Sequence, residues 1–360
     1  MAERIAERLA AIDADGLRRT LRPPSGIDLC SNDYLGLAAH PLLKRRMADA
    51  VIAEGVGSTG SRLLRGERTG FARVEEQFAR FKGTERSLYF SSGYLANLAV
   101  LTAFPEAGDV IFSDQRNHAS LIDGIRLSRA RRVVFPHNDP WALAQLLKED
   151  AGAGQRFVVV ESLFSMDGDQ APLAEYAALC RTAGAALIVD EAHAIGVYGT
   201  RGEGLAGEVF VTINTAGKAM GVSGAFVAGP ADAIEYLIQR ARPFIFSTAP
   251  PPATAAALEA SLEVIASEPE RRKRLLAGAC YLRKRLGLAG DSPIIPVIIG
   301  DSERTVAVAC ELQAAGFDLR AIRPPTVPPG TARLRVAVNQ GLSEEVLDRF
   351  VTALEAATKP

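Results

Sequence analysis

The sequence has few cysteines and few histidines, and their spacing limits the chemistry available to it. The four cysteines, Cys30, Cys180, Cys280 and Cys310, lie far apart and form no C-x-x-C pair. The four histidines include no H-E-x-x-H motif. Neither a disulfide framework nor a zinc centre is therefore expected, and we predict no metal ligand set.

An excess of charge and a long apolar run are also missing. The 41 Lys and Arg nearly balance the 42 Asp and Glu, for a formal net charge of -1, so composition favours no nucleic-acid or acidic-membrane partner. No run is long enough to span a bilayer, and the first residues, MAERIAERLAAID, are charged and amphipathic, unlike a signal peptide. We therefore expect a cytoplasmic protein without a membrane or nucleic-acid partner.

What the sequence does contain is an alternation of short apolar runs and helical segments. The runs, many of them β-branched, are 87–90, 109–112, 132–135, 157–162, 186–190, 209–213 and 225–229. Helical segments at 94–103, 119–130, 140–149 and 172–183 lie between them. Nearly continuous apolar runs are typical of strands covered on both faces. The pattern predicts an α/β fold, with a mostly parallel seven-stranded sheet and helices on both faces.

The pattern changes after Pro230. Helical sequence runs through about 250–286, followed by a strand at 294–299, a helix at 302–315, a strand at 333–338 and a closing helix at 343–357. This order predicts a smaller α+β domain. We expect an N-terminal segment, 1–45, packing with that domain, a large α/β domain over 46–230, and the small domain over 231–360.

Two carboxylates and a histidine follow one of the buried runs, in ALIVDEAHAIG (186–196). They are Asp190, Glu191 and His193, at the strand end where α/β sheets bind ligands. An acid here could be a structural cap, a magnesium ligand or the partner of a cationic cofactor nitrogen. DEAH also occurs in helicases, but these need a G-x-x-x-x-G-K-[ST] loop. The G-K pair at 217–218 is followed by alanine, which excludes the helicase interpretation.

A second strand end carries a single lysine, Lys218, in TAGKAMGVSG (215–224). It is the only Lys or Arg between Arg201 and Arg240. An ammonium among Gly, Ala, Met and Ser at a strand end is poorly solvated, which favours the neutral, nucleophilic amine. Pyridoxal phosphate (PLP) requires a Schiff-base lysine and a carboxylate at its ring nitrogen. Lys218 and Asp190 are the candidate pair, with His193 in reach of the phenolic oxygen.

A phosphate site is predicted where YFSSGYLANLAV (89–100) passes from a strand into a helix. The amides of Gly93 and Tyr94 and the Ser92 hydroxyl would face an anion at the helix N-terminus. Ser-Gly before a helix is also a common cap. The same two interpretations apply to His118, in NHASLIDG (117–124).

Taken together, the motifs resemble the α-oxoamine synthases, fold-type I PLP enzymes that condense an amino acid with an acyl-CoA and release CO2. The resemblance covers nearly the whole chain. It rests on SNDYLGLAAHP (31–41), GVGSTGSRLLRG (55–66), YFSSGYLAN (89–97), NHASLIDG (117–124), ESLFSMDGDQAPL (161–173), VDEAHAIGVYG (189–199), TAGKAMGVSG (215–224), RPFIFSTAPPP (242–252) and AIRPPTVPPGTARLRV (321–336). It implies a fold-type I PLP-dependent transferase that forms a homodimer with sites at the subunit interface.

The resemblance also implies residue roles. Lys218 would hold the cofactor and take the substrate Cα proton, and Asp190 would pair with the pyridine nitrogen. The other implied contacts are Ser92, Gly93, Tyr94 and Thr215 at the phosphate, His193 and Ser165 at the phenolic oxygen, and His118 stacked on the ring. Ser247 and Thr248 would reach the phosphate from a partner subunit.

Substrate contacts are implied in the C-terminal part. Arg335 resembles the arginine that holds the amino-acid carboxylate, and Asn32 would lie near it. The run 321–336 most resembles members that use L-alanine and a pimeloyl thioester of CoA or acyl carrier protein, with Arg323 and Arg18 towards the pimeloyl chain. Alternatives are a sister synthase using glycine or serine with another acyl-CoA, an aminotransferase of the same fold, and a catalytically silent homologue.

Some positions depart from the family pattern or stand outside it. Ala194 replaces the glycine usual after DEAH, and Ala216 replaces a larger residue in the T-x-G-K turn. These changes concern the shape of the substrate pocket more than its chemistry. His137, in FPHND, and His40, before a proline, are interpreted as structural.

Overall fold

The computed structural model describes residues 1–359, which form two compact units. Unit 1 comprises Met1–Asn32, Met166–Gly168 and the chain from Arg274 onward. Unit 2 comprises Asp33–Ser165 and Asp169–Lys273. Residues 166–168 therefore belong to unit 1, although the residues on either side of them belong to unit 2.

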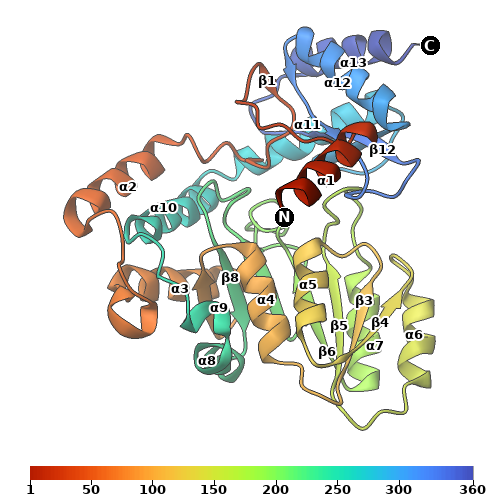
Figure 1. The fold of residues 1–360 in the computed structure, drawn as a ribbon. Helices are drawn as coiled ribbons and strands as arrows, with labels where there is room; N and C mark the ends of the chain where they lie inside the picture. Colours follow the sequence, from red (N-terminus) through yellow and green to blue (C-terminus); the bar gives the residue numbers. More distant parts are fainter. Residues whose placement is uncertain (360) are drawn as a thin grey trace. The chain divides into compact units, whose positions relative to one another are not determined.

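Unit 2 is built on a seven-stranded sheet with the order β2-β8-β7-β6-β5-β3-β4 (Figure 1). The strands are β2 (Arg86–Phe90), β3 (Val110–Asp114), β4 (Arg131–Phe135), β5 (Arg156–Glu161), β6 (Ala185–Asp190), β7 (Val211–Thr215) and β8 (Ala225–Gly229). β8 is antiparallel to β2 and β7, and every other neighbouring pair is parallel. The predicted mostly parallel sheet is confirmed, with β7 beginning two residues later than expected.

Helices cover both faces of this sheet, which explains the continuous apolar runs. The helices of unit 2 are α2 (Pro41–Glu54), the π-helix η1 (Arg62–Gly66), α3 (Thr69–Lys82), α4 (Gly93–Ala103), α5 (Ala119–Leu127), α6 (Pro140–Glu149), α7 (Leu173–Ala183), α8 (Ala231–Arg240), α9 (Arg242–Ile245) and α10 (Ala253–Ser267). One apolar core joins the sheet to α4, α5 and α8, and another joins it to α6 and α7. Strands buried on both sides need no polar face.

Two helix boundaries differ from the prediction. The helix expected over 119–130 ends at Leu127, because Ser128 is extended and its hydroxyl donates to the Ile125 carbonyl at 2.7 Å. The helical sequence expected through 250–286 is two helices, α10 and α11 (Glu270–Arg285), with Pro269 between them. Proline lacks the N–H that a continuous helix would require there.

The compact units also divide the chain elsewhere than the predicted boundaries after residues 45 and 230. α10 packs against α2 and α3, and all three belong to unit 2. The division after Lys273 falls inside α11. The predicted domain boundaries stay a prediction, while the packing of α10 gives the physical reason for the units found here.

Unit 1 contains two small sheets. β9 (Ile294–Gly300), β12 (Ala332–Ala337) and β11 (Ala321–Ile322) form an antiparallel sheet in the order β11-β12-β9. β1 (Ile27–Asp28) pairs in parallel with β10 (Phe317–Asp318), so the first residues share a sheet with the last third of the chain. The helices are α1 (Ala2–Ala14), α12 (Ser302–Ala314), α13 (Glu344–Thr358) and most of α11.

The strands and helices expected from residue 294 onward all lie within one residue of their predicted ends. Among residues 1–359, no helix is long and apolar enough to cross a membrane. The same residues contain no group of three or more His, Cys, Asp or Glu side chains arranged to hold a metal ion. All four cysteines are unpaired.

Candidate cofactor site

The predicted cofactor residues gather at one edge of the unit 2 sheet. β6 ends at Asp190, whose Cα partner on β5 is Glu161, the last residue of that strand. β7 ends at Thr215, three residues before Lys218. β2 runs in the same direction as β7, because β8 is antiparallel to both, so its end delivers α4 to the same edge. Ligand sites of α/β sheets lie at such carboxyl ends.

Lys218 lies at one end of a chain of three polar side chains. Its Nζ is 2.7 Å from Nε2 of His193, and Nδ1 of His193 is 2.7 Å from the Tyr34 hydroxyl. His193 is 4% exposed and Tyr34 is fully buried. The imidazole is thus held on both sides, in an orientation that lets it exchange a proton with the amine. The motif SNDYLG contains Tyr34, but the sequence did not indicate its contact with His193.

Asp190 is buried and bonded through both carboxylate oxygens. Asn97 Nδ2 donates to Oδ2 at 2.8 Å, and the Ala192 amide donates to Oδ1 at 2.9 Å. Asn97 also donates to the Ser120 hydroxyl at 2.9 Å. These contacts orient the carboxylate, as is needed to recognise one ring atom of a ligand. Asn97 belongs to the YLAN motif, and its role was not predicted.

The sequence left two roles open for His118, a helix cap and a ligand contact, and the structure is compatible with both. Its Nδ1 accepts from the Ser120 amide at 3.3 Å and lies 2.7 Å from the Ser120 hydroxyl, so it caps α5. Part of the residue stays accessible. Desolvation lowers the pKa of His118, and the nearby Lys218 charge lowers it further, against an opposing effect of Asp190. An accessible neutral ring suits stacking on a planar ligand.

Glu161 is a buried acid that the sequence analysis did not select. Its Oε2 accepts from the Ser165 amide at 3.2 Å, and its Oε1 has no hydrogen-bond partner among residues 1–359. Burial raises the pKa of Glu161 well above its usual range, and the Asp190 charge raises it further. A carboxyl paired in register with another carboxylate is expected to hold a proton. The only sequence feature that could have indicated Glu161 is its position at the start of the motif ESLFSMDGD.

The predicted phosphate cradle is open because its first helical residue is glycine. A Cβ on Gly93 would lie 2.5 Å from the Thr215 hydroxyl oxygen, so any side chain would fill this space. Ser92 caps α4, its hydroxyl accepting from the Leu95 amide at 3.2 Å. The Tyr94 hydroxyl instead donates to Asp123 at 2.5 Å on α5, which leaves only its backbone amide for the cradle. Hydroxyls beside a helix N-terminus suit phosphate.

These donors fit PLP. The orientated carboxylate of Asp190 suits a cationic ring nitrogen, the amine of Lys218 suits an aldehyde, and the space beside Thr215 suits a phosphate. Ser165 is 8% exposed, and its amide contacts Glu161 at the same edge of the unit 2 sheet. Ser247 and Thr248 lie in the connection between α9 and α10, and their predicted reach into a partner's site stays a prediction.

Glu191 has a different role from its neighbour in the DEAH string. It forms a buried ion pair with Lys82 and accepts the amides of Leu205 at 2.6 Å and Ala206 at 2.8 Å. This carboxylate therefore braces the 204–206 turn and does not face the cradle. Ala194 is buried and is not among the residues with positive φ, so replacing the usual glycine causes no backbone strain.

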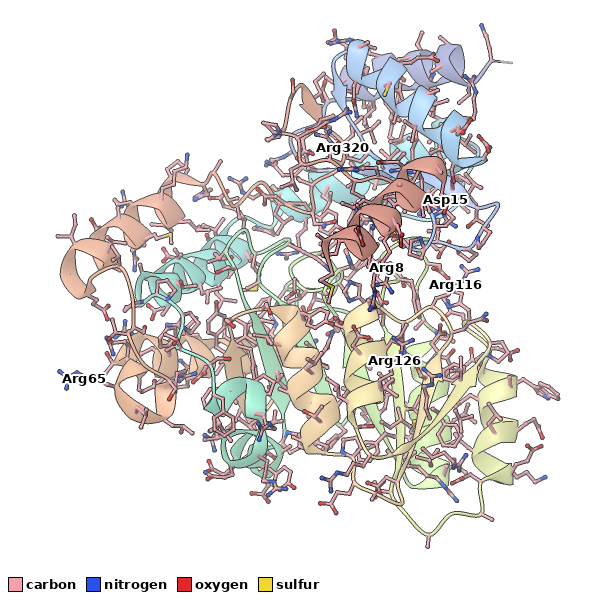
Figure 2. The ribbon with its side chains drawn as sticks, in the orientation of Figure 1. Arg8, Asp15, Arg65, Arg116, Arg126 and Arg320 are labelled. Carbon is pink, nitrogen blue, oxygen red and sulfur yellow. The ribbon has the colours of Figure 1, made fainter. Side chains whose placement is uncertain are left out.

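The four predicted substrate residues, Arg18, Asn32, Arg323 and Arg335, all belong to unit 1. Arg335 is buried on β12. Arg323 donates to the Gly16 carbonyl and, at 3.3 Å, to the Arg18 carbonyl, so two of the predicted residues are brought together. They line a cavity of about 490 Å³ with three further arginines, Arg19, Arg22 and Arg320, the last of which is labelled in Figure 2.

Comparison with known proteins agrees with this geometry. The family described as aminotransferase class I and II matches residues 24–354. The 8-amino-7-oxononanoate synthase of Geobacter sulfurreducens is 44% identical, over 98% of this chain and 97% of that protein. The protein of the same name from Anaeromyxobacter dehalogenans is 47% identical, over 98% and 94%.

Solved structures show the same fold. A serine palmitoyltransferase from S. paucimobilis, with bound PLP and myriocin, is 29% identical, with a TM-score of 0.90 over 98% of this chain and 96% of that one. An 8-amino-7-oxononanoate synthase from Francisella tularensis is 29% identical, with a TM-score of 0.79 over 92% and 97%. The chain therefore belongs to the aminotransferase class I and II family and, within it, to the α-oxoamine synthases.

Proposed function

We propose that the protein is an 8-amino-7-oxononanoate synthase, which condenses L-alanine with a pimeloyl thioester and releases CO2 in biotin biosynthesis. The observation that carries this proposal is the 44–47% identity to synthases of that name over almost the whole chain. The pocket around Lys218 and Asp190 supports it. The amine and the carboxylate that PLP requires are both present, and they are hydrogen-bonded to His193 and Asn97, respectively.

Bound PLP supplies an electron sink for negative charge on the amino-acid substrate. Lys218 would bind it through Nζ, and the same nitrogen would remove the proton from the substrate Cα. His193 Nε2, 2.7 Å from that nitrogen, can take or return a proton, while Tyr34 fixes the imidazole. Asp190 would keep the pyridine nitrogen protonated.

The remaining roles divide between the two units. Ser92, Gly93 and Thr215 would bind the phosphate, and His118 would cover the ring. Arg335, with Asn32 near it, would bind the carboxylate of L-alanine. Arg18 and Arg323 would lie towards the pimeloyl chain, where the arginine-rich cavity favours an anionic group.

A homodimer in the cytoplasm completes the proposal, with Ser247 and Thr248 serving the partner's site. Size-exclusion chromatography with mass measurement tests the assembly, and a fully active monomer would contradict it. The competing function is that of a sister synthase, since serine palmitoyltransferases share the fold at 29% identity.

The deciding experiment is a visible absorbance spectrum of the PLP-loaded protein, titrated with L-alanine, glycine or L-serine, followed by pimeloyl-CoA with thiol release monitored. We expect a spectral change with L-alanine and CoA release only after pimeloyl-CoA is added. A stronger response to glycine or serine would assign a sister activity. Conversion to the pyridoxamine form would indicate an aminotransferase. A spectral response without thiol release, from pimeloyl-CoA or from a pimeloyl-acyl carrier protein, would indicate a silent homologue.

A further inference from the structure

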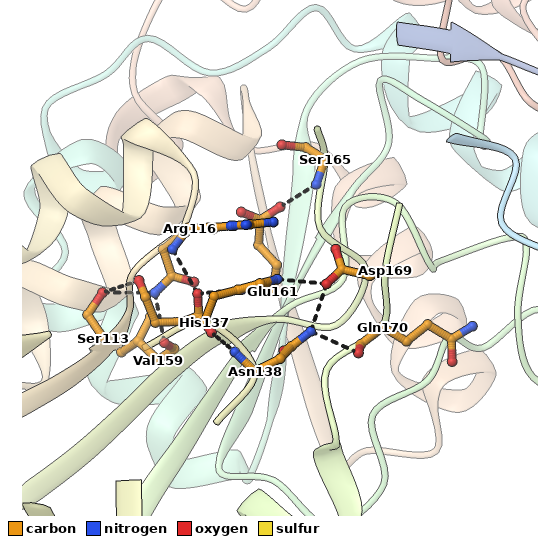
Figure 3. A network of polar contacts seen from close by, with 11 residues as sticks. Ser113, Arg116, His137, Asn138, Val159, Glu161, Ser165, Asp169 and Gln170 are labelled. Atoms are coloured by element: carbon orange, nitrogen blue, oxygen red, sulfur yellow. Dashed lines mark hydrogen bonds and ion pairs between the residues drawn. The ribbon is translucent and has the colours of Figure 1, made fainter. Parts of the chain in front are cut away.

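A second cluster of charged side chains lies beside the cofactor site and has no part in the chemistry proposed above. It centres on His137, two residues after the end of β4, and is drawn in Figure 3. His137 Nδ1 lies 2.9 Å from Asp114 Oδ1, and Nε2 lies 2.7 Å from Asp169 Oδ2. Both ring nitrogens are therefore engaged by carboxylates, the arrangement that a doubly protonated imidazolium satisfies.

The next residue, Asn138, strengthens the same cluster. Its amide donates to Asp114 Oδ2 at 2.9 Å, and its Nδ2 donates to Asp169 Oδ2 at 2.9 Å and to the Gln170 carbonyl at 3.2 Å. The residue has φ of 51°, a left-handed conformation that asparagine adopts more readily than most residues. The turn is thus shaped so that two consecutive side chains face the 169–170 segment.

That segment is one leg of a hairpin that begins at the end of β5. The Ala171 amide donates to the Ser162 carbonyl at 3.0 Å, and the Phe164 amide donates to the Asp169 carbonyl at 2.9 Å. The His137 ring also packs edge-on against Phe164, with 4.4 Å between ring centroids. His137 therefore contacts both legs, one through a carboxylate and one through an aromatic ring.

The leg opposite Asp169 carries Ser165, the residue predicted to contact the cofactor. Ser165 directly follows Phe164, and its amide donates to the buried Glu161 carboxylate. The hairpin tip, Met166–Gly168, belongs to unit 1, where Asp167 accepts from Arg333 at 2.6 Å. The His137 cluster is the anchor on the unit 2 side of this hairpin, next to the residue predicted to bond the cofactor's phenolic oxygen.

We propose that His137, with Asn138, is a positioning residue that clamps the 162–171 hairpin through Asp169 and so holds Ser165 against bound PLP. The proposal rests on the proposed function only for the identity of the cofactor. Loss of the clamp would let the hairpin shift relative to β6, and the contacts made from Ser165 would weaken before any change at Lys218.

The other titratable groups around the clamp do not replace it. Arg116 donates its backbone amide to Asp114 at 2.8 Å, and its charge acts on Asp169. The groups on the neighbouring helices are Asp139, which caps α6, and Tyr176 of α7. Burial acts to raise the pKa of Asp169, but the hydrogen bond and the charge interaction with His137, with smaller contributions from other groups, together outweigh that effect, so the pKa of Asp169 lies below its ordinary value.

The test compares His137→Asn and Asp169→Asn, singly and together, with His40→Asn as the matched control. Like His137, His40 pairs with a carboxylate, Glu268 at 3.3 Å, but it is the N-cap residue of α2, and neither His40 nor Glu268 belongs to the hairpin. Three quantities are measured: the PLP dissociation constant by equilibrium dialysis, the pH titration of the bound cofactor's absorbance, and the thermal midpoint of the cofactor-free protein.

We expect each clamp variant to raise the PLP dissociation constant roughly tenfold, the effect of losing one charge-assisted hydrogen bond, and to shift the absorbance titration. Ser165→Ala should shift the titration in the same direction, and the double clamp variant should add little to either single one. His40→Asn should lower the thermal midpoint and leave PLP binding unchanged.

Clamp variants that lose thermal stability yet keep the PLP constant and the absorbance titration of the parent protein would overturn the proposal. If His137→Asn does not fold, Asp169→Asn, which keeps the side-chain volume, decides alone. None of these measurements uses an acyl thioester, so failure of the proposed synthase activity would be seen separately, in thiol release.

Discussion

The candidate cofactor pocket of unit 2 and the arginine-lined cavity of unit 1 use charge in opposite ways. In unit 2, Asp190, His193 and Thr215 are at most 9% exposed, and the side chains of Asp190 and His193 are bonded to specific partners. In unit 1, the Arg18 side chain is 52% exposed and pairs with the equally exposed Asp13. Charges interact strongly where water is excluded and weakly at the surface.

The difference indicates how well each of the two regions tolerates amino-acid substitution. A buried carboxylate with fixed donors tolerates no substitution without leaving a partner unsatisfied. An exposed arginine is hydrated in any case and can move with its ligand. Cofactor chemistry should therefore depend on single residues of unit 2, whereas acyl-chain selection should be distributed over several arginines of unit 1. Arg335, buried on β12, is the residue of unit 1 that should behave like unit 2.

The largest effect is expected for Lys218→Ala. Without the amine there is no covalent attachment of the cofactor and no base at the substrate Cα, so turnover should fall by about 10⁴-fold or more. CoA release from pimeloyl-CoA measures the rate, and the visible spectrum measures cofactor attachment. Activity within tenfold of the parent protein would remove Lys218 from its assigned role and break the comparison.

Asp190→Asn should come next. The amide is nearly the same size and keeps its place beside Asn97, but it cannot hold a proton on the pyridine nitrogen by charge. We expect a loss of roughly 10³-fold in kcat, because such electrostatic contacts supply several kcal/mol. Asn97→Ala should give a smaller loss in the same kinetic constant. Near-parental turnover by Asp190→Asn would contradict the assignment.

Gly93→Ala tests the phosphate cradle within the same pocket. The new methyl would lie 2.5 Å from the Thr215 oxygen, so it must displace either that side chain or the phosphate. PLP affinity should fall by about tenfold to a hundredfold, as for loss of one or two charge-assisted hydrogen bonds. Gly207→Ala is the control, since its Cβ would meet nothing within 4 Å. Equal PLP binding by both variants would show that the cradle lies elsewhere.

The arginines of unit 1 sharpen the comparison from the other side. Arg335→Ala should raise KM for L-alanine by about a hundredfold, because a buried carboxylate–guanidinium contact is lost. Arg18→Ala should raise KM for pimeloyl-CoA by less than about tenfold, as expected for an exposed charge. Steady-state kinetics in both substrates separates the two. If Arg18→Ala changed kcat more than it changed KM for pimeloyl-CoA, unit 1 would also hold catalytic groups.

The smallest effect concerns the His137 clamp and stability against pH. Hydrogen bonds to Asp114 and Asp169 raise the pKa of His137 from 6.5 to about 9, against the effect of burial. The raised pKa stabilises the folded form fully below pH 6.5, and this contribution is lost as pH rises through about 9. Urea unfolding should show the difference in free energy between the parent protein and His137→Asn narrowing over that range. A constant difference would mean that His137 acts without its charge.

Much of the fold could be predicted from the sequence because its signals are local. Runs such as FVVVE and ALIVD have the apolar continuity of strands covered on both faces. FVVVE lies in β5 and ALIVD lies in β6. The catalytic candidates could be found because they lie at strand ends: Asp190 is the last residue of β6, and Lys218 lies three residues after the end of β7. Where the prediction differed, the cause was also local: Ser128 turned the chain out of α5 and Pro269 separated two helices.

The contacts that orient the site could not be predicted in the same way. Tyr34 and His193 are 159 residues apart, and Asn97 and Asp190 are 93 apart. No local periodicity reports which of many Tyr or Asn side chains will meet a given group. His137 looked like an ordinary turn residue until the fold placed Asp114 on one side of its ring and Asp169 on the other.

The sequence by itself determined the strands, the order of motifs and the identity of the residues able to react, since these depend on short-range patterning and on side-chain chemistry. Only the tertiary structure decided which carboxylate would belong to the candidate cofactor pocket and which would not. Asp190 accepts from Asn97, whereas the adjacent Glu191 is paired with Lys82. Successive residues at a strand end point in different directions, and only the packed neighbours determine what each one meets.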